Sequence, residues 1–201
     1  HQHGLCHRDV KPSNVRVTPG GRAVLVDFGL VRDDLAETLT RTGTFQGSAS
    51  YASPEQIRGT REDIGPRTDV YGLAVTLYEA LTGRVPFERA RMDATLHAVL
   101  TGDAPRPRTL RPDLTRDVET VIETGMERDP QRRYESADAF ARDLDACLSL
   151  RPIEARPPRV LRRVGLWMRR RPWHALSLAL VCLMIALGGF AISDYGPATV
   201  T

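Results

Sequence analysis

Near the start of the chain, two short runs rich in valine flank a turn. Residues 15–17 (VRV) and 23–26 (AVLV) are β-branched or apolar at most positions, and the segment TPGG at 18–21 separates them. β-Branched side chains favour strands, and Pro followed by Gly favours a tight turn. The pattern predicts a β-hairpin over residues 15–26.

Helical patterns dominate the sequence beyond residue 67. The first helical segment is apolar at most positions and ends at Gly83, which predicts a buried helix that stops at a glycine. The last one follows Ser136, whose hydroxyl can cap a helix N-terminus. Apolar residues in these segments recur near helical spacing. The predicted helices cover residues 68–83, 92–102, 113–126 and 136–150.

In residues 31–67 the apolar positions follow neither the alternation typical of a strand nor the spacing typical of a helix. The segment is rich in Thr, Gly, Ser and charged residues, so the pattern predicts a long loop, and loops of this length usually carry function. No internal repeat is visible in the sequence. The predicted fold class is therefore mainly α with a small β-hairpin.

One apolar run is long enough to cross a bilayer. Residues 173–192 contain no Asp, Glu, Lys or Arg, and about 20 apolar residues span a hydrocarbon core of roughly 30 Å. A buried core helix would also be apolar, but this run is apolar on all sides and follows the arginine-rich segment RRRPW. We predict a single transmembrane helix at 173–192, followed by a short extracytoplasmic tail at 193–201.

Positive charge is concentrated in front of this run. The net charge is only +3, yet residues 151–172 hold eight arginines and one acidic residue, Glu154. Because the remaining sequence is slightly acidic, the distribution argues against a nucleic-acid partner. We interpret 151–172 as a basic juxtamembrane linker. Arginines on one flank only predict that residues 1–150 lie in the cytoplasm and that the C-terminus lies outside the cell membrane.

The three cysteines form no recognisable framework. Cys6, Cys147 and Cys182 are far apart and make no CxxC pair, so their spacing predicts neither a disulfide scaffold nor a zinc site.

The strongest candidate chemistry lies in HRDVKPSN at 7–14. Asp9, Lys11 and Asn14 follow the spacing D-x-K-x-x-N, and Asp27 follows the second predicted strand directly. A hairpin brings its two ends together, so these four side chains should meet at one edge. Two carboxylates, an amide and an ammonium suit a metal-bound polyphosphate. Lys11 is also the only lysine among the 28 lysine and arginine residues, which argues against a casual surface position.

Six motifs together resemble one family in order and spacing. On this basis residues 3–148 resemble the C-terminal lobe of a bacterial eukaryotic-like (Hanks-type) serine/threonine protein kinase. The family's N-terminal lobe, with its glycine-rich loop and strand lysine, has no counterpart here, and the chain begins with His. We expect the chain to be a fragment or a truncated protein. The motifs are HRDVKPSN (7–14), DFG (27–29), GSASYASPEQ (47–56), DVYGLAVTLYE (69–79), TGRVPF (82–87) and RDPQRR (128–133).

The resemblance implies roles for the clustered residues in phosphoryl transfer from ATP to protein serine or threonine. Asp9 would orient the substrate hydroxyl and accept its proton, and Lys11 would contact the transferred phosphoryl group. Asn14 and Asp27 would hold Mg²⁺ or Mn²⁺ against the nucleotide phosphates. A compact ammonium fits beside Asp9 where a planar guanidinium would not fit equally well. Lysine at this position is also typical of serine/threonine kinases.

The resemblance also implies regulatory residues. Arg8 would receive a phosphate from the activation loop, for which Thr44 is the first candidate and Thr42 the second. Ser48 stands where the family more often has threonine and would contact Asp9 and Lys11. Autophosphorylation of Thr44 or Thr42 would bring two copies of the kinase together as a homodimer.

Three further residues would support the site without taking part in the chemistry. Glu55 would pair with Arg133, and Asp69 would accept backbone N–H bonds from the catalytic loop. The family packs the histidine of its HRD motif on the phenylalanine of DFG, so His7 is not assigned to a metal. His1 and His3 are expected at the exposed end of the preceding helix and are not assigned to a metal either.

Two readings of function remain open from the sequence. The first is the catalytic lobe of a membrane-anchored serine/threonine protein kinase in signalling, whose partners are protein substrates and the membrane. The second is a truncated, non-catalytic kinase-like module that docks partners at the membrane. The complete set of metal ligands favours the first, whereas the missing lobe favours the second.

Overall fold

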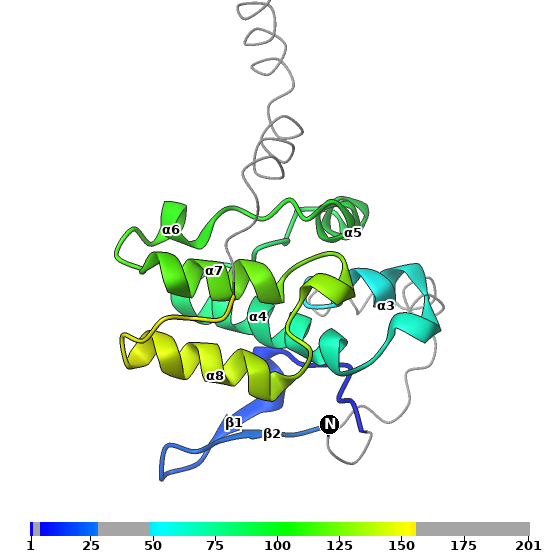
Figure 1. The fold of residues 1–201 in the computed structure, drawn as a ribbon. Coiled ribbons are helices and arrows are strands. Elements are labelled where there is room, and N and C mark those ends of the chain that lie inside the picture. The colour runs from blue at the N-terminus through cyan, green and yellow to red at the C-terminus, as the bar shows by residue number, and fades with distance from the viewer. Residues whose placement is uncertain (2–4, 28–48, 156–201) are drawn as a thin grey trace, which may run out of the picture. The chain divides into compact units, whose positions relative to one another are not determined.

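A computed structural model gives the fold of residues 1, 5–27 and 49–155 (Figure 1). The predictions for Thr42, Thr44, Ser48 and residues 156–201 lie outside this part of the chain. The described part is mainly helical with one small sheet, as the sequence predicts. Its elements are η1 (Pro12–Asn14), β1 (Val15–Val17), β2 (Ala23–Leu25), α3 (Pro54–Arg58), η3 (Arg61–Asp63), α4 (Pro66–Thr82), α5 (Met92–Thr101), α6 (Pro107–Leu110), α7 (Arg116–Gly125), η4 (Pro130–Arg132) and α8 (Ala137–Leu148).

Helix α4 is the centre of the fold because it is apolar on more than one side. Val70 and Ala74 pack into one cluster with residues of α7 and α8, and Tyr71 and Val75 pack into a second cluster with Phe87 and α5. Proline at the first helical position and Gly83 at the end, with φ of +68°, set the limits of α4. The predicted buried helix at 68–83 is therefore confirmed.

Helices α7 and α8 lie against α4. Figure 1 shows α7 and α8 side by side in front of α4, and each of the three helices contacts the other two. Thr115 and Ser136 cap α7 and α8 with their hydroxyls, which accept bonds from the N–H groups of Val118 and Ala139. The predicted helices at 113–126 and 136–150, and the one at 92–102, are all present with slightly shorter bounds.

The predicted hairpin is also confirmed. Strands β1 and β2 are antiparallel, with Val15 opposite Leu25 and Val17 opposite Ala23. The N–H of Gly21 donates to the carbonyl of Thr18 at 2.9 Å, and the φ of +77° at Gly21 is one that glycine adopts without strain. The hairpin thus returns the chain to the place where β1 begins.

The prediction of a continuous loop at 31–67 is wrong for its described second half. Residues 54–58 form helix α3, which starts with a reciprocal capping box between Ser53 and Gln56 and ends at Gly59 with φ of +69°. Helix α3 and the turn η3 are too short to show a 3.6-residue period, so hydrophobic pattern could not reveal them. The signals of α3 in the sequence are local ones, Ser53-Pro54 at its start and Gly59 at its end.

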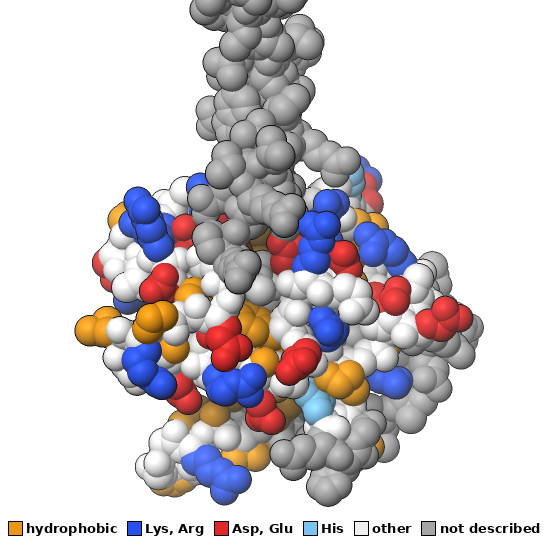
Figure 2. Space-filling model, in the orientation of Figure 1, with side chains coloured by type: hydrophobic (Ala, Val, Ile, Leu, Met, Phe, Trp, Pro, Cys, Tyr) orange, Lys and Arg blue, Asp and Glu red, His pale blue; other side chains and the backbone are white. Residues whose placement is uncertain are grey.

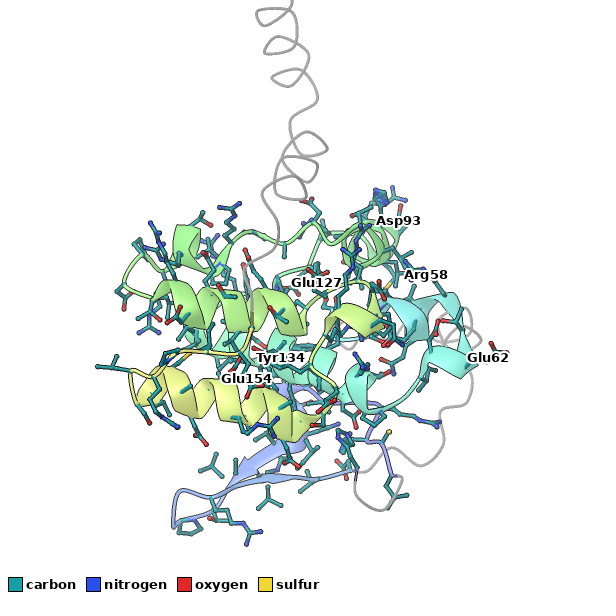
Figure 3. The ribbon with its side chains drawn as sticks, viewed as in Figure 1. Arg58, Glu62, Asp93, Glu127, Tyr134 and Glu154 are labelled. Atoms are coloured by element: carbon teal, nitrogen blue, oxygen red, sulfur yellow. The ribbon has the colours of Figure 1, made fainter. Side chains whose placement is uncertain are left out.

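The segment after α8 lies on the core. Asp143 is buried and accepts bonds from the Tyr134 hydroxyl at 2.8 Å and from the N–H groups of Glu154 and Ala155 at 2.8 and 2.9 Å. Figure 3 shows Tyr134 and Glu154 together beside α8. Burial, and then the Asp143 carboxylate, raise the pKa of Tyr134. The packing therefore extends to Ala155, within the segment 151–172 that the sequence analysis interprets as a linker.

Charges of both signs cover the visible face of this lobe. Figure 2 shows basic and acidic side chains interspersed, without a large area of one sign on that face. Within the described residues, none of the helices is both long and apolar enough to span a bilayer. The predicted transmembrane segment at 173–192 lies outside those residues.

Candidate active site

The structure brings Asp9, Lys11 and Asn14 together. The Lys11 ammonium donates to both carboxylate oxygens of Asp9, at 3.0 and 2.8 Å. The amide nitrogen of Asn14 donates to the main-chain oxygen of Asp9 at 2.8 Å and to Oδ2 at 3.1 Å. The turn η1 makes this possible, because Pro12 starts it and the N–H of Asn14 donates to the carbonyl of Lys11 at 3.0 Å. The Lys11 ammonium and the Asn14 amide therefore both hold the Asp9 carboxylate in place.

This cluster is partly open to solvent. The side chains of Lys11 and Asp9 are 16% and 32% exposed, while Asn14 is buried. An ion pair of this exposure contributes little to stability, about 0–1 kcal/mol. The arrangement instead keeps a carboxylate and an ammonium within reach of a bound molecule.

The hairpin returns Asp27 to the same edge. The N–H of Val26 donates to the carbonyl of Asn14 at 2.8 Å, and the ring of His7 bonds the carbonyl of Val26 at 2.9 Å. Asp27 follows directly, is exposed and has φ of +57°. Asn14 bonds Asp9 through its amide nitrogen, so a cation would bind Asn14 through its amide oxygen. An amide oxygen and an exposed carboxylate are the hard ligands that Mg²⁺ prefers, and these residues therefore fit the ion.

Asp69 fixes the backbone in front of Asp9. Its two carboxylate oxygens accept the N–H groups of His7 at 2.8 Å and Arg8 at 2.7 Å. Arg8 has φ of +62°, and Gln56 of α3 donates to its carbonyl at 2.7 Å. Burial raises the pKa of Asp69, while the two backbone N–H bonds oppose that shift. The contact is the one that the sequence analysis expects of Asp69.

Gly72 lets α4 approach this loop. A Cβ at Gly72 would lie 2.8 Å from the carbonyl oxygen of Val10 and 2.9 Å from its Cβ. Any other residue would push the loop away from α4. The glycine therefore helps to set the position of Asp9, next to Val10 in the chain.

Glu55 and Arg133 form a buried bidentate ion pair. The guanidinium donates to the two carboxylate oxygens at 2.6 and 2.7 Å, and the Thr68 hydroxyl adds a bond at 2.9 Å. Arg133 also lies 4.8 Å from the ring centroid of Tyr71. Burial alone would raise the pKa of Glu55, but the bonds and charge of Arg133 outweigh it and lower that pKa. This is the pair that the sequence analysis predicts, and it joins α3 to the segment before α8.

Other residues lie inside the motifs quoted above, but the sequence does not reveal which residues they contact. The Tyr51 hydroxyl donates to Glu79 of α4 at 2.6 Å, and burial followed by this bond raises the pKa of Tyr51. Gln56 and Gly72 act through contacts with Arg8 and Val10, which are distant in sequence. Arg8 is exposed, whereas its predicted phosphate donors Thr42 and Thr44, and also Ser48 and Phe28, lie outside the described residues.

A search of protein-family models decides the family. The family model described as "Protein kinase domain" matches residues 1–144, which are well over half of the chain. The chain belongs to the protein kinase family. The motifs that suggested a Hanks-type kinase all fall within the matched residues, and the fold is that of a kinase-domain fragment.

Several bacterial kinases are similar to this family member. The tyrosine-protein kinase MasK of Myxococcus xanthus is 41% identical over 145 residues, which are 72% of this chain and 22% of MasK. The serine/threonine-protein kinase PknL of Mycobacterium tuberculosis is 39% identical over 146 residues, 73% of this chain and 36% of PknL. The serine/threonine-protein kinase PknA from the same species is 40% identical over 159 residues, 79% of this chain and 35% of PknA. The chain thus spans about a fifth to a third of the length of these curated relatives.

Proposed function

We propose that this chain forms the catalytic lobe of a serine/threonine protein kinase. The observation that carries the proposal is the cluster of Asp9, Lys11 and Asn14, in which one partly exposed carboxylate is held by an ammonium at 2.8 Å and an amide at 3.1 Å. The reaction is transfer of a phosphoryl group from a nucleotide to a protein hydroxyl.

In this proposal Asp9 handles the acceptor hydroxyl. Its carboxylate orients the hydroxyl and accepts its proton as the new oxygen–phosphorus bond forms. Lys11 is close enough to Asp9 to place its positive charge beside the transferred group, where negative charge spreads over three oxygens. Asn14 fixes the carboxylate in orientation through its amide nitrogen.

Asn14 and Asp27 are the proposed ligands of the family's metal ion. Protein kinases generally use ATP with Mg²⁺, and Mn²⁺ is the alternative ion. The bound ion neutralises charge on the nucleotide phosphates. The residues of this chain would hold the ion with the Asn14 amide oxygen and the Asp27 carboxylate.

The choice of serine and threonine rests on Lys11 and on the relatives. PknL and PknA bear the name serine/threonine-protein kinase, whereas MasK bears the name tyrosine-protein kinase. Lysine two residues after the proposed base is typical of the serine/threonine group. Analysis of the phosphorylated amino acid in the product distinguishes the two.

The proposal also covers how the kinase is regulated and where in the cell it acts. A phosphate on Thr44 or Thr42 would pair with Arg8, which is exposed beside the proposed base, and Ser48 would contact Asp9 and Lys11. Protein substrates and a second copy of the kinase, for autophosphorylation, are the proposed partners. Arginines in 151–172 and the apolar run at 173–192 would hold the lobe at the cytoplasmic face of the membrane.

The test is substitution of the proposed base in the complete gene product. Asp9→Asn keeps the size of the side chain and removes its charge, so turnover should fall by at least about a hundredfold while nucleotide binding stays close to wild type. Asp27→Ala should weaken Mg²⁺-dependent nucleotide binding as well. Asp145→Asn, which changes an exposed carboxylate on α8, serves as the control. The measurements are phosphate transfer to a generic protein substrate and calorimetric titration with nucleotide and Mg²⁺.

The outcomes separate the two readings of function. Near-normal turnover of Asp9→Asn would show that another group is the base. Absence of turnover in the wild-type gene product, with intact folding, would favour the non-catalytic docking module instead.

A further inference from the structure

Three side chains that could hold a metal ion lie close together next to the backbone that precedes Asp9. His1, Cys6 and Asp69 each present one ligand atom, and these three atoms lie within 4.8 Å of one another. The ring Nε2 of His1 is already 2.9 Å from Oδ2 of Asp69. Cys6 is a free thiol of intermediate exposure, and Asp69 is buried.

The three side chains come from separate parts of the sequence. Cys6 directly precedes the HRD motif, Asp69 lies in the first turn of α4, and His1 lies five residues before Cys6. Spacing of the cysteines alone pointed away from zinc, since the pattern CxxC is absent. The fold supplies the group by bringing a histidine and an aspartate to one cysteine.

His7 is not part of this group. Its Nε2 bonds the carbonyl of Val26 at 2.9 Å, and its Nδ1 accepts the N–H of Asp9 at 3.3 Å. Both ring nitrogens are therefore engaged with backbone atoms, and the backbone N–H of His7 contacts the Asp69 carboxylate. The ring of His1 instead points its Nε2 at Oδ2.

The donor set and its charge suit zinc. One imidazole nitrogen, one sulfur and one carboxylate oxygen form the mixed set that Zn²⁺ takes, with water completing a tetrahedron. A thiolate and a carboxylate would neutralise the two positive charges of the ion. At zinc bond lengths the ligand atoms would lie about 3.3–3.6 Å apart, so His1 and Asp69 must separate slightly and Cys6 must move closer.

Asp69 can bind an ion without losing its structural bonds. Oδ1 accepts the N–H of Arg8, and Oδ2 accepts the N–H of His7. A carboxylate oxygen has two lone pairs, so the ion would take the place on Oδ2 where His1 now bonds. His1 Nε2 would then bind the ion through its lone pair, and the Cys6 thiol would release its proton to solvent.

We propose that His1, Cys6 and Asp69 form a Zn²⁺ site that ties the segment before the catalytic loop to α4. Because Asp69 holds the N–H groups of His7 and Arg8, an ion on this carboxylate stabilises the backbone that positions Asp9. The site is structural and takes no part in phosphoryl transfer. It stands whether or not the proposed kinase activity is found.

Cobalt(II) is the probe that tests the site, because a thiolate ligand gives it an intense near-ultraviolet band. The experiment uses the complete chain, purified without a histidine tag, and follows absorbance during Co²⁺ titration and during displacement by Zn²⁺. Wild type should show the thiolate band with one equivalent of Co²⁺. Cys6→Ser should remove the band, whereas Cys147→Ser and Cys182→Ser, the matched controls, should keep it.

Two further measurements separate a built site from binding to a thiol alone. His1→Gln should weaken Co²⁺ affinity by at least about tenfold. Hydrogen exchange at the amides of His7 and Arg8 should slow on Zn²⁺ addition in wild type and remain unchanged in Cys6→Ser. The proposal is overturned if wild type shows no thiolate band, if Cys147→Ser or Cys182→Ser removes it, or if His1→Gln leaves the affinity unchanged.

Discussion

Two residues at the candidate active site hold strained backbone. Among the described non-glycine residues, Arg8, Asp27 and Leu150 have positive φ, and the first two lie on either side of the Asp9–Asn14 cluster. Such conformations cost about 1–3 kcal/mol each and persist only where neighbours hold them. Arg8 is held at both its N–H and its carbonyl, by Asp69 and Gln56. The strain therefore lies where the proposed chemistry needs a fixed backbone.

Tyr71 and Tyr78 allow a matched test of hydroxyl groups in the core. Both are almost fully buried on α4. The Tyr78 hydroxyl donates to the carbonyl of Pro105 at 3.0 Å, but the Tyr71 hydroxyl has no hydrogen-bond partner within the described part of the chain. Its ring is stacked on Phe87, with centroids 6.3 Å apart, a contact that phenylalanine would keep.

We expect Tyr71→Phe to be neutral or stabilising, since it removes a buried hydroxyl that costs about 1–3 kcal/mol when unpaired. Tyr78→Phe should destabilise the lobe by about 0.5–1.5 kcal/mol, because it removes a made bond. Denaturant unfolding of both variants measures the difference. A larger loss for Tyr71→Phe than for Tyr78→Phe would mean that the Tyr71 hydroxyl is paired in solution.

At the residue scale, the sequence predicts contacts between residues that are close together along the chain. One short turn that starts with Pro12 brings together three residues within six positions, Asp9, Lys11 and Asn14. Asp27 lies at the same edge because of a hairpin, which its Pro-Gly turn predicts. The bonds from Gln56 to Arg8 and from Tyr51 to Glu79 join residues far apart in sequence. Their partners depend on how α3 and α4 pack, which no local pattern contains.

At the scale of elements, local sequence pattern predicts the long helices but misses the short ones. The long helices could be predicted because their apolar residues recur over several turns and because residues such as Gly83 and Ser136 mark their ends. Helices α3 and α6 (Pro107–Leu110) have five and four residues, which is too few for a period. Helix α3 is nevertheless essential to the arrangement, because it carries Glu55 and Gln56 to Arg133 and Arg8.

The link between α3 and the segment before α8 predicts a pH dependence. The folded-state pKa of Glu55 is lower than that of the free side chain, whose pKa is about 4.3. The ion pair therefore stabilises the lobe fully above that value, and the stabilisation is lost as pH falls through the lowered folded-state pKa. Glu55→Gln should cost about 3–5 kcal/mol at neutral pH, because the buried Arg133 loses its counter-ion.

Denaturant unfolding between pH 7 and pH 3 tests this link. The free energy of unfolding should depend less on pH in Glu55→Gln than in wild type. Glu62→Gln is the control, since Glu62 is exposed and points outward in Figure 3. Equal pH profiles for Glu55→Gln and wild type would contradict the assignment.

At the scale of the whole molecule, the described lobe is one part of a kinase. The family model covers residues 1–144, and the relatives are three to five times longer than the matched segment. Kinase nucleotide sites lie between two lobes, so the proposed ligands Asn14 and Asp27 would supply one side of such a site. Nucleotide affinity, substrate choice and partners are therefore properties to measure on the complete gene product.

The remaining prediction concerns the orientation of the chain in a membrane. Residues 151–172 contain eight arginines, and residues 193–201 contain none. Positive residues near a span are retained in the cytoplasm, so a span at 173–192 would place the lobe on the side where ATP is found. Residues 173–192 should then cross the bilayer once, with the C-terminus outside. A reporter enzyme that works only outside the cytoplasm, fused after Thr201, should be active, and replacing arginines 162, 163 and 169–171 with glutamine should reduce that activity. Activity of a cytoplasm-only reporter at the same position in the unaltered chain would exclude a single span.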